Sequence, residues 1–292
     1  MPGTACAATP SSSSTATLKV LVLNAWHGGT RIPGGVGMIA DITRESGASL
    51  VFIPEATETT PDIVARLNAS GLDFQQRMTG DTAILSAYPV GKAAALPGMT
   101  KAIVTIETVE MAAYAAHLEY RWYATYLPRG YGPGVPRGEF SEYGWGRIPS
   151  GPVTHTAAVG RVNEDSGRPQ VITQFIADAY RLQYPAPATH PGFTWPAGNP
   201  QLESNELTWA PEADERDRID FVFHHPDHRL RLTDAQLVGP RESIVRNQRV
   251  VESGEDSFVP ADMPWPTDHK GVLAIYTVQG KGCAPELAGR EI

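Results

Sequence analysis

The chain has 292 residues, of which 41% are hydrophobic, so it can bury one large core, and we expect a single α/β domain. Its formal net charge of −8 excludes the broad basic face that accompanies tight, sequence-independent binding of nucleic acid. The cysteines are Cys6 and Cys283, which excludes a zinc cluster and a dense disulfide framework and leaves one disulfide open in an oxidising compartment.

The first 17 residues are small and rich in Ser and Thr, and they lack the charged start and apolar run of a secretory signal. Two interpretations stay open: a disordered leader, or the remainder of a trimmed signal, in which case the protein is secreted. We expect one domain at 18–278 and a C-terminal tail at 279–292. No apolar run reaches the roughly 18 residues that a membrane span requires, so the sequence predicts a soluble protein, and we expect a monomer.

In chain order, the first two predicted strands are apolar runs that each end in a polar residue. The run LKVLVLNAWHGG (18–29) leads to Asn24, and SLVFIPEAT (49–57) leads to Glu55. A helix is predicted between them at 36–45. A second helix follows, with Pro61 in its first turn and Gly71 at its end.

The middle and the end of the chain predict further strands, two helices and a long loop. Strand-like runs at 82–90, 101–110 and 111–120 are close enough for hairpin or meander connections, so the sheet architecture is mixed. Residues 127–152 are rich in Gly, Pro and aromatic residues and predict a functional loop. Helices are predicted at 154–161 and 169–182, and strands at 218–226 and within 264–277.

Polar residues recur at the ends of these strands. Each of these residues has an ordinary structural explanation by itself, because an Asn that closes a strand is usually a turn former and a strand His is often packed in the core. Together they indicate more, since the strands of one sheet can bring such ends to one edge. The set comprises Asn24, Glu55, the pair Arg218 and Asp220, and the pair Asp268 and His269.

The order of these residues resembles the endonuclease/exonuclease/phosphatase superfamily across 18–277, nearly the whole chain. The run LVFIPEAT resembles the family strand that carries a metal-binding Glu, with Pro54 where Gln is common, and TAILSAYPV resembles its ILSRYP strand, with Ala87 in place of Arg. AHLEY resembles its His-Leu strand, and PTDHKGV resembles its terminal Ser-Asp-His motif. The resemblance implies an α/β (α+β) fold, a four-layer αββα sandwich of two mixed, mainly antiparallel sheets flanked by helices.

The resemblance also implies an activity, namely hydrolysis of phosphoester or phosphodiester bonds by metal-activated water, with Mg²⁺ or Mn²⁺ as cofactor. Magnesium takes hard oxygen ligands, and the acidic balance of the chain suits a metal-dependent enzyme. The implied metal residues are Asn24, Glu55 and Asp268. The implied catalytic residues are His269, Asp220, which orients a histidine, and His117. The long loop offers substrate contacts at Arg129, Tyr131, Arg137 and Trp145. The substrate stays open between nucleic acid, lipid and small phosphoesters.

One family motif has no counterpart: no Asp-x-Asn occurs in the sequence, although the family uses this pair to orient the attacking water. We therefore predict that a central segment is missing, by genuine loss or through a truncated gene model, with the junction at 177–179. Asp178 is a poor substitute, because the sequence gives it neither a strand nor the Asn. The alternative function is a catalytically impaired or inactive member of the fold that acts as a binding protein. Signatures of other hydrolase and nucleotide-binding classes are absent.

Overall fold

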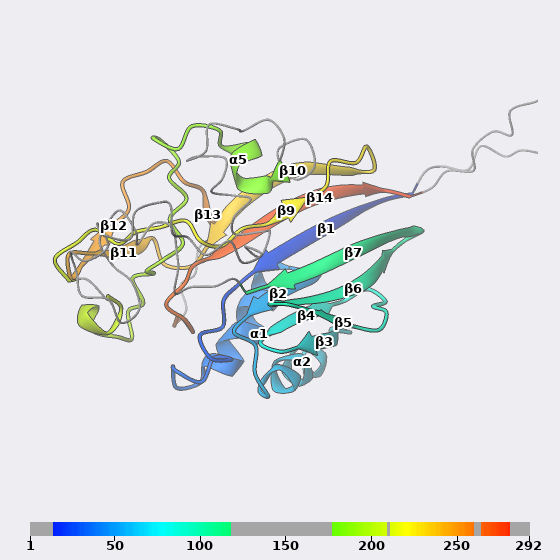
Figure 1. The fold of residues 1–292 in the computed structure, drawn as a ribbon, viewed down its shortest axis with the longest axis horizontal. Coiled ribbons are helices and arrows are strands. Elements are labelled where there is room, and N and C mark those ends of the chain that lie inside the picture. Colours follow the sequence, from blue (N-terminus) through cyan, green and yellow to red (C-terminus); the bar gives the residue numbers. More distant parts are fainter. Residues whose placement is uncertain (1–13, 118–176, 209–210, 260–263, 281–292) are drawn as a thin grey trace, which may run out of the picture.

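The structure is a computed structural model that describes residues 14–117, 177–208, 211–259 and 264–280 (Figure 1). These residues form a mixed α+β sandwich, as the sequence predicts. The predicted helix at 154–161 and the predicted loop at 127–152 lie outside the described residues. None of the helices in the described part of the chain is long and apolar enough to cross a membrane.

The larger sheet has seven strands in the order β13-β10-β14-β1-β2-β4-β3. Its centre is β1 (Thr15–Val22), which pairs in parallel with β2 (Leu50–Pro54) and antiparallel with β14 (Gly271–Gln279). All other pairs are antiparallel except β10 with β13. The outer strands are β3 (Gln75–Thr79), β4 (Thr82–Ser86), β10 (Leu230–Val238) and β13 (Phe258–Val259).

Three smaller sheets accompany it. A three-stranded antiparallel sheet contains β5 (Ala94–Leu96), β6 (Met99–Ile106) and β7 (Val109–Ala116). A two-stranded sheet joins β8 (Ala177–Asp178) to β9 (Phe223–His224), and a hairpin joins β11 (Glu242–Val245) to β12 (Gln248–Val251). Besides the two longer helices described below, the described ranges contain α5 (Ala179–Gln183) and a short 3₁₀ turn, η3 (Ser204–Glu206).

Two cores explain why β1 and β2 are continuous apolar runs. Alternate β1 residues, such as Val20 and Val22, face a core shared with the β5-β6-β7 sheet, whereas Leu21 belongs to the core beneath α1 (Gly35–Ser46) and α2 (Thr60–Ala69). Both faces of these strands are therefore buried, which favours β-branched and aliphatic residues at every position. Figure 1 shows α1 and α2 together on one side of the large sheet.

The predicted elements at 18–29, 36–45, 49–57 and 111–120 correspond to β1, α1, β2 and β7, although the bounds shift by a few residues. The first strand begins at Thr15 rather than at Leu18, because Thr15 already pairs with Gln279 across the sheet. Most of the predicted strand at 218–226 is irregular, and its strand is limited to Phe223–His224. The strands β3, β5 and β11 to β13 were not predicted, since they are short. The longer β10 was also not predicted; a register shift between Leu232 and Asp234 interrupts its pairing with β14.

Candidate active site

Asn24 and Glu55 lie together, just beyond the ends of the parallel neighbours β1 and β2. The amide Nδ2 of Asn24 donates to Oε1 of Glu55 over 3.1 Å, and the amide Oδ1 accepts from the backbone N–H of Trp26 over 2.8 Å. Because β1 and β2 are parallel, both chain exits point to the same sheet edge. The prediction that these two strand ends meet is therefore supported by their direct hydrogen bond.

The loop after β1 completes the environment of Glu55. The backbone N–H of His27 donates to Oε2 of Glu55 over 3.0 Å, so each carboxylate oxygen accepts one hydrogen bond. Glu55, Trp26 and His27 all have positive φ, at 56°, 41° and 56°. Such left-handed non-glycine residues cost free energy and concentrate at functional sites. Here the conformation accompanies the approach of the His27 backbone N–H to the Glu55 carboxylate.

His117 lies immediately after β7 and is held between two carboxylates. Its Nδ1 is 2.6 Å from Oδ2 of Asp81, and its Nε2 is 3.8 Å from Oε1 of Glu55. A carboxylate only accepts hydrogen bonds, so Nδ1 carries the proton and Nε2 faces Glu55. Asp81 precedes β4 in the turn that follows β3, and no motif in the sequence marks it. Sequence reasoning missed this residue.

His269 is fixed from the opposite side by Asp220. Its Nδ1 is 2.9 Å from Oδ2 of Asp220, and its Nε2 is 4.0 Å from Oδ1 of Asp268. All three residues are largely buried. The backbone N–H groups of Ile219 and Asp220 donate to Oγ1 of Thr194, which locks the segment before β9 against the loop at 190–199.

Trp195 is the second site residue that the sequence did not predict. Its indole Nε1 donates to Oδ2 of Asp268 over 3.1 Å. The backbone around the pair is also tied, because Ala197 N–H donates to the carbonyl of Asp268 over 2.7 Å. The signal in the sequence is only a Phe-Thr-Trp-Pro run within a Pro-rich stretch, which by itself indicates a loop.

The electrostatics connect the two halves of the site. Burial lowers the pKa of His269, but the carboxylates of Asp220, Asp268 and Glu55 outweigh it and raise this pKa to about 9. Burial, with a contribution from Glu55, raises the pKa of Asp268, against the opposing effects of His269 and the Trp195 indole. Glu55 thus contributes to the electrostatic environment of both residues of the Asp-His pair. The predicted metal site requires Glu55 and Asp268 to lie near each other.

The donor set fits a hard divalent cation that keeps several waters. Within the described ranges, no group of three or more His, Cys, Asp and Glu side chains is arranged to hold a metal ion. Magnesium needs only one or two carboxylates, because waters and substrate phosphate complete its shell. Glu55 retains free lone pairs, since each of its carboxylate oxygens accepts one hydrogen bond and its side chain is 23% exposed.

The structure near 177–179, where the sequence predicts the junction of the missing segment, differs from the predicted helix. The predicted helix at 169–182 is wrong at 177–178, where the backbone is a strand paired with β9, and α5 begins only at Ala179. Asp178 ends the strand and caps the helix, accepting from the N–H groups of Tyr180 and Arg181. Its other oxygen is 2.7 Å from Nη2 of Arg218, so Arg218 pairs with Asp178. Residues 118–176 lie outside the described chain, and the missing segment stays a prediction.

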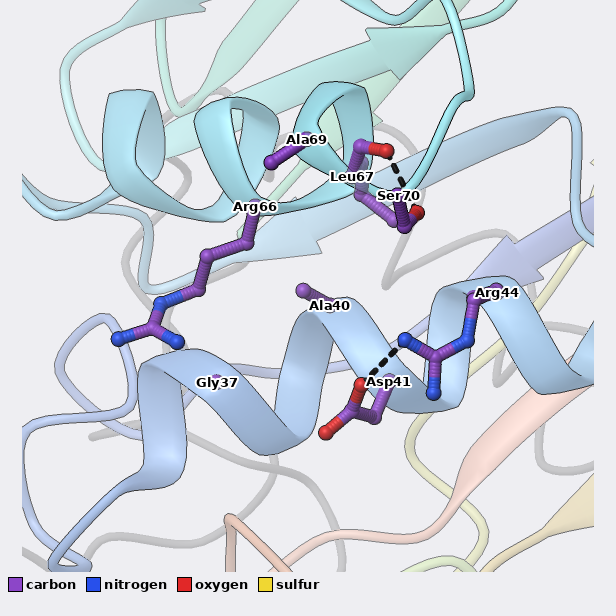
Figure 2. Close-up of a pocket in the computed structure, with 8 residues that line it drawn as sticks. All are labelled: Gly37, Ala40, Asp41, Arg44, Arg66, Leu67, Ala69 and Ser70. Carbon is purple, nitrogen blue, oxygen red and sulfur yellow. Dashed lines mark hydrogen bonds and ion pairs between the residues drawn. The ribbon is translucent and has the colours of Figure 1, made fainter.

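Three predicted substrate contacts, Arg129, Tyr131 and Arg137, lie outside the described residues, as does Trp145. A surface pocket of about 310 Å³ lies elsewhere, between α1 and α2. Figure 2 shows Arg44 turned to Asp41 within this pocket, at 2.7 Å, and Arg66 reaching toward Gly37. No predicted site residue lines the pocket.

The sequence matches no protein-family model and no curated protein. Among solved structures, one similar to this chain is an endonuclease/exonuclease/phosphatase from Beutenbergia cavernae, with 15% identity, a TM-score of 0.46, and coverage of 91% of this chain and 72% of that one. Truncated Caenorhabditis elegans TDP2 is 14% identical, with a TM-score of 0.50 over 89% of this chain and 97% of that one. D. rerio TDP2 complexed with a single-strand DNA product is 12% identical, with a TM-score of 0.51 over 89% and 99%.

The fold of this chain is similar to the fold of TDP2. The TDP2 likeness extends over nearly the full length of both chains. Within this fold, the site described above collects side chains from the ends of β1, β2 and β7, the turn before β4, and the loops before β9 and β14. A fold does not fix a function, so the activity has to be argued from these side chains.

Proposed function

We propose that the chain hydrolyses phosphoester or phosphodiester bonds with the help of a divalent cation. The observation that carries the proposal is that two imidazoles are held in the same way, each between two carboxylates. Each imidazole is bound through Nδ1 by one carboxylate and turns Nε2 toward another. The residues are His117 with Asp81 and Glu55, and His269 with Asp220 and Asp268.

His269 is proposed as a donor to the substrate phosphate. With a pKa of about 9, its ring is protonated at neutral pH, and because Nδ1–H is bound by Asp220, Nε2–H is the proton that can reach a substrate. Phosphoryl transfer spreads negative charge over the non-bridging oxygens, and a pre-oriented cationic donor stabilises it. Asp220 is the positioning residue, because it fixes the ring and favours its charged form.

His117 is proposed as a second phosphate contact. Asp81 holds the Nδ1 proton, and Nε2 faces Glu55. A phosphate oxygen only accepts hydrogen bonds, so this contact requires the imidazolium form of the ring, in which Nε2 also carries a proton. Asn24, Glu55 and Asp268 would hold Mg²⁺ or Mn²⁺. When bound, such a cation supplies positive charge that a phosphate needs as its ester bond breaks. The substrate is open between nucleic acid, lipid and small phosphoesters, and single-stranded DNA is the first test because the D. rerio TDP2 structure holds such a product.

The absence of Asp-x-Asn favours a second candidate, a non-catalytic protein of this fold that binds phosphoesters without turnover. Asp178 is engaged by the start of α5 and by Arg218 in the structure. A chain without the water-orienting pair is expected to be slower by about a hundredfold or more.

One assay separates the two candidates. The protein is incubated with bis-p-nitrophenyl phosphate, and with single-stranded and plasmid DNA, over a range of Mg²⁺ and Mn²⁺ concentrations. Activity that disappears in His269→Ala supports the hydrolase, and no turnover at any metal concentration supports the binding protein. His228→Ala is the matched control, because His228 also lies beside an aspartate, Asp227 at 3.4 Å, but its side chain is 88% exposed.

A further inference from the structure

The loop that follows Asn24 is built rigidly against the site. The four residues from Trp26 to Gly29 all have positive φ, from 41° to 78°. The backbone N–H of Gly28 donates to the carbonyl of Glu55 over 2.8 Å, and the hydroxyl of Thr59 donates to the carbonyl of Gly28 over 2.7 Å. With the bond from His27 N–H to Glu55, these contacts fix the loop on the same residue whose carboxylate is proposed to bind the cation.

This loop presents two side chains that the proposed mechanism does not use. His27 and Arg31 are both exposed, and Nη2 of Arg31 is 3.3 Å from Nε2 of His27. In the part of the chain that the structure describes, no carboxylate lies within ion-pair distance of the Arg31 guanidinium. By contrast, Arg44, Arg216, Arg218 and Arg229 each pair with a carboxylate.

The position of this pair sets what it can bind. The imidazole of His269 is buried, whereas His27 is exposed at the surface and is attached to Glu55 through its backbone N–H. A ligand that reaches His27 and Arg31 therefore extends beyond the scissile group. Arg presents several N–H groups in a planar fork that matches phosphate oxygens, and a neighbouring imidazole adds one more donor.

We propose that His27 and Arg31 bind a second phosphate group, next to the one that is cleaved. This inference rests on the proposed function and deepens it, because it assigns the substrate to the class of phosphodiesters that carry an adjacent phosphate, as a short oligonucleotide does. The pair supplies a local cationic contact in a chain whose net charge is −8. The hydrogen bonds of His27 and Gly28 fix the loop backbone before binding, which reduces the ordering cost.

The test compares substrates that differ by one phosphate: thymidylyl-thymidine (TpT), its 5′-phosphorylated form (pTpT) and its 3′-phosphorylated form (TpTp). For the unmodified protein, kcat/KM should be about tenfold higher for one of the two phosphorylated forms than for TpT. That ratio should fall to near one in Arg31→Gln, and should fall in His27→Asn, which keeps a residue tolerant of positive φ. The preferred end identifies the side on which the second phosphate lies.

The matched control is Arg66→Gln, an exposed arginine at the α1–α2 pocket, which should leave the ratio unchanged (Figure 2). The same ligands are titrated calorimetrically into His269→Ala, so that affinity is measured without turnover. Equal values for all three ligands in both experiments, or an advantage that survives Arg31→Gln, would overturn the inference. Failure of the proposed function is distinct from this, since it appears as absent hydrolysis while the difference in binding remains.

Discussion

The indole Nε1 of Trp195 donates a 3.1 Å hydrogen bond to Oδ2 of Asp268, across 73 positions of the sequence. This bond fixes one carboxylate oxygen, so that the other, Oδ1, faces Nε2 of His269. We expect Trp195→Phe, which keeps most of the ring and removes the N–H, to lower kcat about tenfold, because a hydrogen bond to a charged group is lost. Steady-state kinetics with bis-p-nitrophenyl phosphate measure this effect, and thermal unfolding shows whether the fold is retained. An unchanged kcat would mean that Asp268 is positioned without the indole.

Asp81 should act through His117 alone. Asp81→Asn offers an amide in place of an obligate acceptor, so the ring proton is no longer fixed on Nδ1, and we expect kcat to fall by tenfold or more. Residues that work as one unit are not additive. The double variant Asp81→Asn/His117→Gln should therefore be no slower than His117→Gln. If the two losses multiply instead, Asp81 has a role that does not depend on His117.

The sequence predicts the parts of the site that follow regular strands. Asn24 and Glu55 end apolar runs, and parallel pairing of β1 with β2 brings them to one edge. A continuous apolar run that ends in a polar residue can indicate such a strand end from the sequence. Asp81 and Trp195 follow no such pattern, because a turn and a Pro-rich loop carry no periodicity. Their roles depend on tertiary contacts with His117 and Asp268, which lie 36 and 73 positions away.

The prediction of a helix at 177–178, where the structure has a strand, is wrong for a similar reason. The run from 169 to 182 has helical periodicity, but Asp178 caps the helix with its side chain, and its own backbone pairs with Phe223. A single short polar residue can begin a helix within a periodic run when a partner strand is available. The partner, β9, is distant in sequence, so local pattern alone cannot reveal the boundary.

The pH dependence of stability should include a contribution from His224. Burial lowers the pKa of this half-buried imidazole below 6.5, against an opposing effect of Asp178, and its Nδ1 is 3.1 Å from the hydroxyl of Tyr276. As pH falls, the unfolded chain takes up this proton first. The stability contribution is thus complete above about 6.5 and is lost as pH decreases below it.

We expect the unfolding free energy of the unmodified protein to fall more steeply between pH 7 and pH 5 than that of His224→Gln, which retains hydrogen-bonding groups but does not titrate. Urea titrations at each pH measure the difference. His228→Gln is the control, because this side chain is 88% exposed. Parallel pH profiles for the unmodified protein and His224→Gln would contradict the lowered pKa.

Gly28 should be intolerant of any side chain, for two separable reasons. Its φ is +68°, and a Cβ there would lie 2.0 Å from Oγ1 of Thr57 and 2.5 Å from Oγ1 of Thr59. Gly71 has φ +89° but nothing within 4 Å of such a Cβ, so Gly71→Ala carries the backbone cost alone, about 1 kcal/mol. We expect Gly28→Ala to cost about 3 kcal/mol in unfolding free energy, because the clash adds to the backbone strain.

The two glycine variants should also separate stability from function. The clash at Gly28 displaces the loop whose N–H groups bind Glu55, so Gly28→Ala should lower kcat even at temperatures where it stays folded. Gly71→Ala, at the end of α2, should keep the activity of the unmodified protein. Urea unfolding and kinetics on both variants measure these effects. Equal loss of stability in the two variants would show that the loop after β1 can move to accept a methyl group. In that case the loop would hold His27 and Arg31 less rigidly than the hydrogen bonds of Gly28 indicate.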